Sequence, residues 1–178
     1  MIKDELTSKN CLFLICPTDC IEALISINFK GQAFFYTALG ACFEWDIITQ
    51  KSLVETIAKK NIRQITLVTK MNNTFFMDKI KVKYNLANYS IEKALQDIED
   101  KLPQHFTFWD KLPKLKILAT HHLKQEQQKL VNTTILGDFI SSKNILVNSF
   151  LYNDENQKFI KSKTLRQQIF FFEEFSIN

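Results

Sequence analysis

The sequence predicts an α/β fold: a mainly parallel central sheet flanked by helices, with an antiparallel hairpin at its C-terminal edge. The first observation is a set of short, almost wholly apolar runs such as Leu12–Cys16, which is typical of strands buried on both faces of a sheet. The second is that helical patterns alternate with these runs across short connections. The third is the length of 178 residues, which suits a single domain over residues 1–178.

The composition excludes several classes of function. The chain has 23 Lys and Arg against 19 Asp and Glu, a net charge of +4, which is too mild an excess to predict nucleic-acid binding. No apolar run approaches the roughly 20 residues of a membrane helix, and residues 1–10 lack the apolar core of a signal peptide. We therefore expect a cytoplasmic protein that binds no membrane and keeps its four cysteines reduced.

The first predicted strand ends at a turn that carries thiols and a carboxylate. Pro17 has no N–H group to donate to a sheet, so the strand Leu12–Cys16 ends there. Asp19 then lies near the start of a short helix over residues 21–27, where a carboxylate can accept backbone hydrogen bonds. Ligands of open α/β sheets bind beyond the carboxyl ends of the strands, so this turn, which also holds Cys20, is where we expect chemistry.

The next segment repeats the alternation of strand and helix. Ala33–Thr37 is aromatic and apolar and predicts the second strand. An apolar stripe predicts the clearest helix of the chain, with Thr49 or Ser52 as its cap and Asn61 as its left-handed stop. Gln64–Thr69 is rich in β-branched residues and predicts the third strand. Strands joined in this order by helices indicate parallel pairing.

The second half of the chain is less regular. Lysines alternate over residues 79–84, which predicts an extended segment with one solvated face. Residues 104–119 receive no assignment. His121 and His122 are adjacent and would point about 100° apart on a helix, which favours surface or cap roles. The remaining predicted elements are a helix that begins at Ser90 and ends before Pro103, helices over 120–131 and 133–140, a strand over 145–152, and an antiparallel edge strand over 157–160.

This order of elements resembles the β-class carbonic anhydrases. Four segments carry the resemblance, and each is similar to a signature of the family: Leu12–Asp19 to Cys-x-Asp-x-Arg, Gly31–Ala41 to Gly-Asp-x-Phe-x-x-Arg-Asn-x-Gly-Asn, Gln64–Thr74 to His-x-x-Cys-Gly, and Ile145–Phe159 to His-Gly-Trp-x-Tyr-Asp and its hairpin. The identities at signature positions are Gly31, Phe34, Gly40 and Tyr152. The resemblance implies a homodimer, for which the apolar segments Phe75–Met77 and Phe170–Phe172 would supply surface.

The resemblance also implies that most of the family's zinc site is lost. The family binds zinc through two Cys and one His, beside an Asp–Arg pair. Cys16 matches the first ligand, whereas Lys70 stands at the His position and Asn73 at the second Cys position. A cationic Lys cannot replace a neutral imidazole as a zinc ligand. Asp19 falls one residue late, and the Arg position falls on Cys20 or Ile21.

The sequence therefore favours a divergent, non-catalytic carbonic-anhydrase-like protein that acts as a binding or scaffold protein without a cofactor. Without zinc there is no hydroxide nucleophile at neutral pH, and no other catalytic motif is present. One alternative is an active carbonic anhydrase, a lyase that hydrates CO₂, with zinc on a rearranged site of Cys16, Cys20 and Cys42. The other is a binder of a small anion or metabolite that uses Lys70 at the carboxyl end of the sheet. The candidate pocket comprises Cys16, Asp19, Cys20, Cys42, Lys70 and Asn73.

Overall fold

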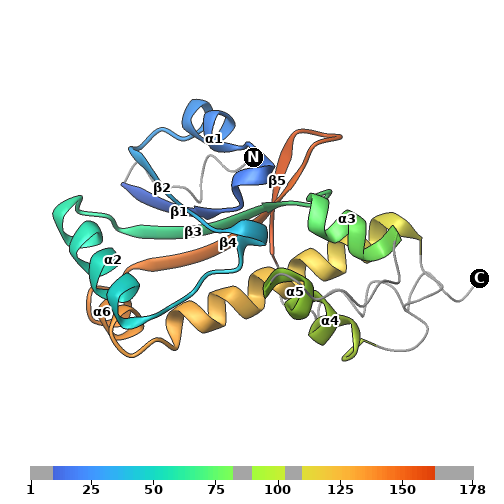
Figure 1. Ribbon diagram of the computed structural model, residues 1–178. Coiled ribbons are helices and arrows are strands. Elements are labelled where there is room, and N and C mark those ends of the chain that lie inside the picture. Colours follow the sequence, from blue (N-terminus) through green and yellow to red (C-terminus); the bar gives the residue numbers. More distant parts are fainter. Residues whose placement is uncertain (1–9, 82–89, 103–109, 163–178) are drawn as a thin grey trace, which may run out of the picture.

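The computed structural model describes residues 10–81, 90–102 and 110–162, and a five-stranded sheet forms its centre (Figure 1). The strands are β1 (Cys11–Ile15), β2 (Ala33–Thr37), β3 (Gln64–Lys70), β4 (Leu146–Asn153) and β5 (Lys158–Lys161). Their order across the sheet is β2-β1-β3-β4-β5, in which only β4 and β5 pair antiparallel. The predicted parallel sheet and its antiparallel edge hairpin are confirmed.

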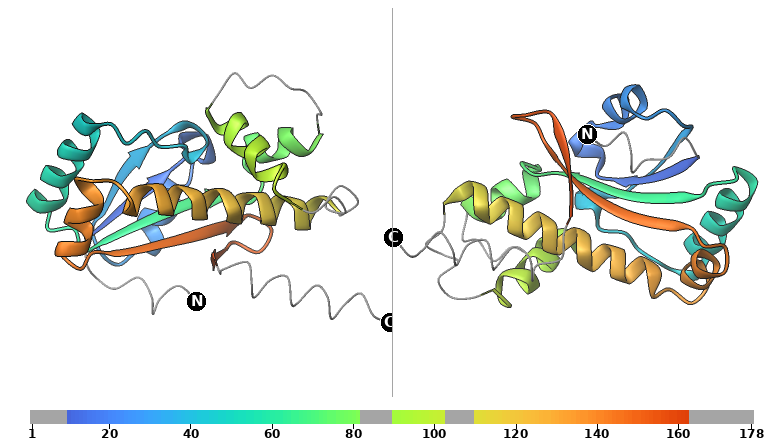
Figure 2. Two further views of the ribbon diagram at one scale, coloured as in Figure 1. Left: turned by 90° about the horizontal axis from the view of Figure 1, so that it is seen from below. Right: turned by 180° about the vertical axis from the view of Figure 1, so that it is seen from behind.

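Helices cover both faces of the sheet. They are α1 (Glu22–Asn28), α2 (Ile47–Lys59), α3 (Thr74–Lys81), α4 (Ser90–Glu99), α5 (Lys111–Val131) and α6 (Leu136–Ser142). Side chains alternate between the faces of β1, so Phe13 and Ile15 pack in a small core with Ile25 of α1. Leu12 and Leu14 face a larger core built with the other helices. The long α5 runs beneath β3 and β4 (Figure 2).

The segment predicted to be extended from residue 79 is helical as far as Lys81, where α3 ends. Phe76 is fully buried on this helix and anchors it to the core. Lys79 lies 3.1 Å from Glu99 of α4, so it is not part of a solvated face. The extended structure predicted from the alternating lysines is wrong as far as Lys81, because Phe76 and the contact with α4 determine the local structure. Residues 82–84 lie outside the described residues.

Two helices begin earlier than predicted. α5 begins at Lys111 rather than at residue 120, and Pro113 lies in its first turn, where the absent N–H group removes no helical hydrogen bond. α2 begins after Asp46, whose Oδ1 accepts hydrogen bonds from the backbone N–H groups of residues 48 and 49 at 2.8 and 2.9 Å. Asp46 is therefore the cap, rather than Thr49 or Ser52. The predicted left-handed stop at Asn61 is confirmed by its φ of 48°. None of the helices within the described residues has the length and apolar character needed to cross a membrane.

Candidate functional site

Asp19 joins the carboxyl ends of β1 and β3. A short 3-10 turn, η2 (Pro17–Asp19), follows β1 and turns the Asp19 carboxylate inward, where the residue is only 1% exposed. Its Oδ2 accepts hydrogen bonds from the Thr69 hydroxyl at 3.0 Å and from the Lys70 backbone N–H at 2.9 Å. Its Oδ1 accepts one from Asn73 Nδ2 at 2.7 Å. The carboxylate thus binds β3 rather than the start of the following helix.

Asn73 is held in one orientation from both sides. Its Oδ1 accepts a hydrogen bond from the Phe75 backbone N–H at 2.9 Å, which leaves its NH₂ group to face Asp19. Burial raises the pKa of Asp19, and the hydrogen bonds from Lys70, Asn73 and Thr69 oppose that rise. We call these four residues the Asp19 cluster, in which hydrogen bonds from the other three occupy both oxygens of the Asp19 carboxylate.

The Lys70 side chain leaves the Asp19 cluster. Its Nζ lies 3.5 Å from Asp154 Oδ2 in the turn between β4 and β5. Lys70 hydrogen-bonds to Asp19 through its backbone N–H, and the charge of its side chain also lowers the pKa of Asp19. The ammonium group is therefore shared with a carboxylate and is not free to attract an anion into the turn after β1.

Cys16 connects the end of β1 to the turn after β2. The residue is fully buried, and its Sγ accepts a hydrogen bond from the Gly40 N–H at 3.0 Å and lies 3.0 Å from Thr18 Oγ1. Gly40 lies in the second 3-10 turn, η3 (Leu39–Ala41), with a φ of 62°. A Cβ at this position would lie 2.5 Å from Ile91 Cγ1, so the conformation and the close contact both require glycine.

Beyond η3, a group of buried polar residues on α5 was missed by the sequence analysis. His122 is fully buried, with Nε2 2.8 Å from the Gly40 carbonyl oxygen, so its predicted surface or cap role is wrong. His121 is half-buried. Glu126, also fully buried, accepts hydrogen bonds from the Phe43 N–H at 3.1 Å and from Lys129 Nζ at 2.6 Å. Once α5 is extended to Lys111, a signal exists in the sequence: His122 and Glu126 continue the apolar stripe of Leu115 and Leu118 at helical spacing.

The residues of the predicted pocket therefore have separate partners in the structure. Asp19, Asn73 and the Lys70 backbone meet, whereas Cys16 turns to Gly40. Cys42 donates toward Glu126 Oε1 at 4.0 Å, and burial raises its pKa to about 11. Cys20 is exposed, and its Sγ lies 3.6 Å from the Pro17 carbonyl oxygen. Within residues 10–81, 90–102 and 110–162, no three or more His, Cys, Asp or Glu side chains are grouped to hold a metal ion.

The side chains at the two positions where the family resemblance places zinc ligands are not suited to bind zinc. Asn73 presents its NH₂ group to Asp19, and the Lys70 ammonium is directed to Asp154. Neither group offers the lone pair of a thiolate or a neutral imidazole. Cys16 alone keeps a ligand atom of suitable type, and that atom already accepts the Gly40 N–H. At this edge of the sheet, Asn73 therefore forms a hydrogen bond with Asp19, and Lys70 forms an ion pair with Asp154.

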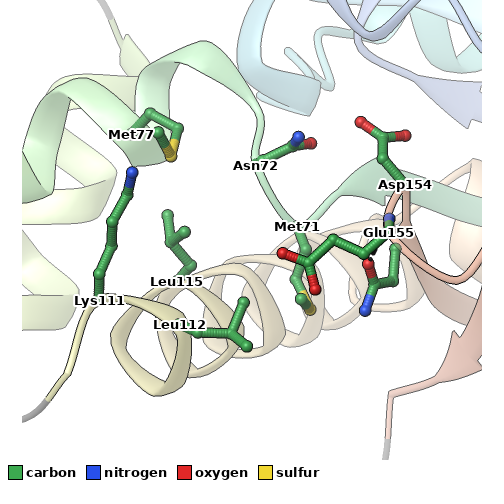
Figure 3. Close-up of a pocket in the computed structure, with 9 residues that line it drawn as sticks. Met71, Asn72, Met77, Lys111, Leu112, Leu115, Asp154 and Glu155 are labelled. Atoms are coloured by element: carbon green, nitrogen blue, oxygen red, sulfur yellow. Dashed lines mark hydrogen bonds between the residues drawn. The ribbon is translucent and has the colours of Figure 1, made fainter.

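A cavity of about 290 Å³ lies beside this cluster, beyond the carboxyl ends of β3 and β4 (Figure 3). Its apolar lining comes from the segment after β3, from α3 and from α5. Its polar lining comes from Asn72 after β3, from the start of α5, and from the end of β4 with the turn that follows it. The sequence analysis did not predict this cavity, because the start of α5 falls in the stretch left unassigned. The lining residues are Met71, Asn72, Met77, Lys111, Leu112, Leu115, Asn153, Asp154 and Glu155.

Comparison with known proteins identifies relatives by structure only. No protein-family model matches the sequence, and no curated protein matches it significantly. A tetrameric β-carbonic anhydrase from the filamentous ascomycete Sordaria macrospora is 12% identical with a TM-score of 0.70, over 86% of this chain and 80% of that chain. The β-carbonic anhydrase CafD of Aspergillus fumigatus is 12% identical with a TM-score of 0.70, over 89% of this chain and 91% of that chain.

A further similar structure is the Coccomyxa β-carbonic anhydrase in complex with acetazolamide. It is 14% identical to this chain, with a TM-score of 0.63 over 93% of this chain and 84% of that chain. Structural similarity at such low sequence identity establishes the fold alone. The function of the site therefore has to be argued from its own residues. The chain has the fold of the β-class carbonic anhydrases.

Proposed function

We propose that this chain is a non-catalytic protein with a β-carbonic anhydrase fold, and that it acts by binding a partner or ligand. The observation that carries the proposal is the Asp19 cluster. Asp19 accepts three hydrogen bonds from the β3 end, one of them from Asn73 at 2.7 Å, at the position where the family resemblance places a zinc ligand. Hydrogen bonds here connect the ends of β1 and β3, and they engage the Asp19 carboxylate and the Asn73 NH₂ group.

The residues at the family's zinc positions bear directly on the reaction, because neither Lys70 nor Asn73 offers a zinc ligand. Hydration of CO₂ at neutral pH by this class of enzyme depends on zinc, which lowers the pKa of its bound water to about 7. A zinc site rearranged on Cys16, Cys20 and Cys42 is not supported, because these thiols have separate partners: Gly40, Pro17 and Glu126. The anion-binding alternative at Lys70 is weakened by its ion pair with Asp154.

Self-association as a homodimer belongs to the same proposal. The Sordaria macrospora relatives are tetrameric, and two surface residues near the β1–β2 side, Ile27 and Leu39, are 83% and 49% exposed. Phe76 supplies no surface for pairing, because it is fully buried in its own core, and residues 170–172 lie outside the described part of the chain. Light scattering at micromolar concentration tests this point: a mass of 20.9 kDa would contradict the dimer.

Stopped-flow CO₂ hydration with added zinc tests the catalytic part of the proposal. We expect no rate above buffer for the natural sequence, with an active β-class carbonic anhydrase as the positive control. The double variant Lys70→His/Asn73→Cys restores two ligand types and provides an informative comparison. We expect it to bind zinc more tightly than the natural sequence does. Hydration by the natural sequence well above buffer would refute the proposal.

A further inference from the structure

In this protein, side chains of the Asp19 cluster occupy the position at which open α/β sheets usually bind ligands. The chain moves from β1 to β2 on one side and returns to β3 on the other, so β1 and β3 form the switch point at which such sheets bind ligands. The Asp19 cluster occupies that crevice with mutual hydrogen bonds. The 290 Å³ cavity lies one strand further along, at the ends of β3 and β4.

The middle of this cavity is apolar. Met71 and Leu115 are buried and form its floor, with Met77 and Leu112 beside them (Figure 3). Leu112 is 47% exposed, so this part of the lining is open to solvent. Methionine side chains adapt readily to the shape of apolar ligands. The volume is at the small end of the roughly 300–1,000 Å³ typical of ligand pockets, which points to a ligand smaller than a nucleotide.

One end of the cavity is cationic. Lys111 is the first residue of α5, and the first turn of that helix contains no acidic residue. A cation at a helix N-terminus opposes the helix dipole, so local stability does not explain this lysine. None of the ion pairs among the described residues includes Lys111. Its side chain extends along the cavity wall beside Met77 (Figure 3).

The opposite end is anionic. Asp154 is neutralised by Lys70 at 3.5 Å, whereas Glu155 has no ion pair among the described residues. The turn that carries Glu155 is fixed, because its backbone N–H donates to Asn153 Oδ1 at 2.9 Å. Figure 3 shows Glu155 across the cavity from Lys111. A ligand spanning the cavity thus meets a positive charge, an apolar floor and a negative charge in sequence.

We propose that this cavity binds a small zwitterion whose opposite charges lie at the two ends of an apolar body, as in ω-amino acids and dipeptides of apolar residues. The carboxylate end meets Lys111 and the ammonium end meets Glu155. The inference rests on the proposed function as a binding protein and names its ligand class. A simple anion or a simple cation would satisfy only one end of the cavity.

Amide NMR titration of the full chain tests the proposal, with ε-aminocaproate and the dipeptide Ala-Leu as probes. We expect saturable shifts at Met71, Asn72 and Glu155. Caproate lacks the ammonium group and hexylamine lacks the carboxylate, and each should bind about fivefold more weakly than ε-aminocaproate, the loss of one partly exposed ion pair. Equal binding of all three compounds would overturn the zwitterion assignment.

Variants at exposed positions locate the site. Lys111→Met should weaken ε-aminocaproate about fivefold and leave hexylamine unchanged, and Leu112→Trp should fill the cavity and abolish binding. Lys51→Met, at an exposed position on α2, is the matched control and should change nothing. Failure of both zwitterions to give saturable shifts up to about 10 mM, roughly ten times the dissociation constant of a ligand bound by about −4 kcal/mol, would overturn the inference. If the protein holds no zinc and gives no saturable shifts, only the ligand assignment is refuted. Measured CO₂ hydration would instead refute the proposed function itself.

Discussion

Replacing Asp19 by alanine should destabilise the protein substantially, because its carboxylate accepts hydrogen bonds from two donors that have no other acceptor shown within the described residues, one buried and one partly buried. The Lys70 N–H and the Asn73 NH₂ group would both lose their partner, whereas the Thr69 hydroxyl can rotate to another acceptor. A stranded buried donor costs about 1–3 kcal/mol, so two of them cost about 2–6 kcal/mol. For a chain of this size each kcal/mol lowers the melting temperature by about 2–4 °C.

A double-mutant cycle isolates the central hydrogen bond. In Asp19→Asn, one side-chain atom becomes a donor and faces the Asn73 NH₂ group, which cannot rotate without losing the Phe75 N–H. The exchanged pair Asp19→Asn/Asn73→Asp restores a donor opposite an acceptor and keeps the bonds from Lys70 and Phe75. We expect each single variant to lose about 1–3 kcal/mol and the exchanged pair to recover most of that loss.

Urea denaturation followed by circular dichroism measures all four members of the cycle. An Asp19→Ala loss below about 1 kcal/mol would be smaller than one stranded donor and would refute the reasoning. Additive losses in the exchanged pair would also contradict it, since additivity is the behaviour of residues that do not interact.

Three further predictions concern other buried groups. Gly40→Ala should cost about 2 kcal/mol or more by denaturation, from the left-handed φ and the contact of 2.5 Å with Ile91; a loss below about 0.5 kcal/mol would be inconsistent with that contact. Burial lowers the pKa of His122 below the ordinary 6.5, so the unfolded chain binds a proton that the folded protein excludes. The free energy of unfolding should therefore fall as the pH drops from about 7.5 to about 5.5, more steeply than in His122→Gln; parallel profiles would contradict this. Burial also raises the pKa of Cys11 to about 12 and of Cys42 to about 11, and Cys16 is buried, so a disulfide reagent should titrate one native thiol, absent in Cys20→Ser; rapid reaction of a second thiol would contradict this burial.

The strands could be predicted from the sequence because their signal is local. Leu12–Cys16 is apolar on both faces and Gln64–Thr69 is rich in β-branched residues, and both patterns suit a central parallel strand that is buried on both faces. The resemblance drew attention to Gly40, and the structure gives a physical reason for a glycine there, because a Cβ would lie 2.5 Å from Ile91 Cγ1. Helix starts were harder, since Asp46 and Lys111 open their helices in stretches where the apolar period is not yet established.

The contacts of the site depend on tertiary structure and could not be predicted in the same way. Asp19 and Asn73 lie far apart in the sequence, and nothing local indicates that a carboxylate after β1 would accept the NH₂ group of an amide after β3. The Lys70 side chain leaves for Asp154 because β4 runs beside β3 and ends in an acidic turn. The cavity combines α5 with the β4–β5 turn, which only the assembled sheet brings together.

The metal content of the protein, purified without added zinc and analysed by elemental spectrometry, tests the central claim most directly. We expect zinc far below one ion per 20.9 kDa chain, because Lys70 and Asn73 offer no zinc ligand and their polar groups bind Asp154 and Asp19. One tightly held zinc per chain would contradict it.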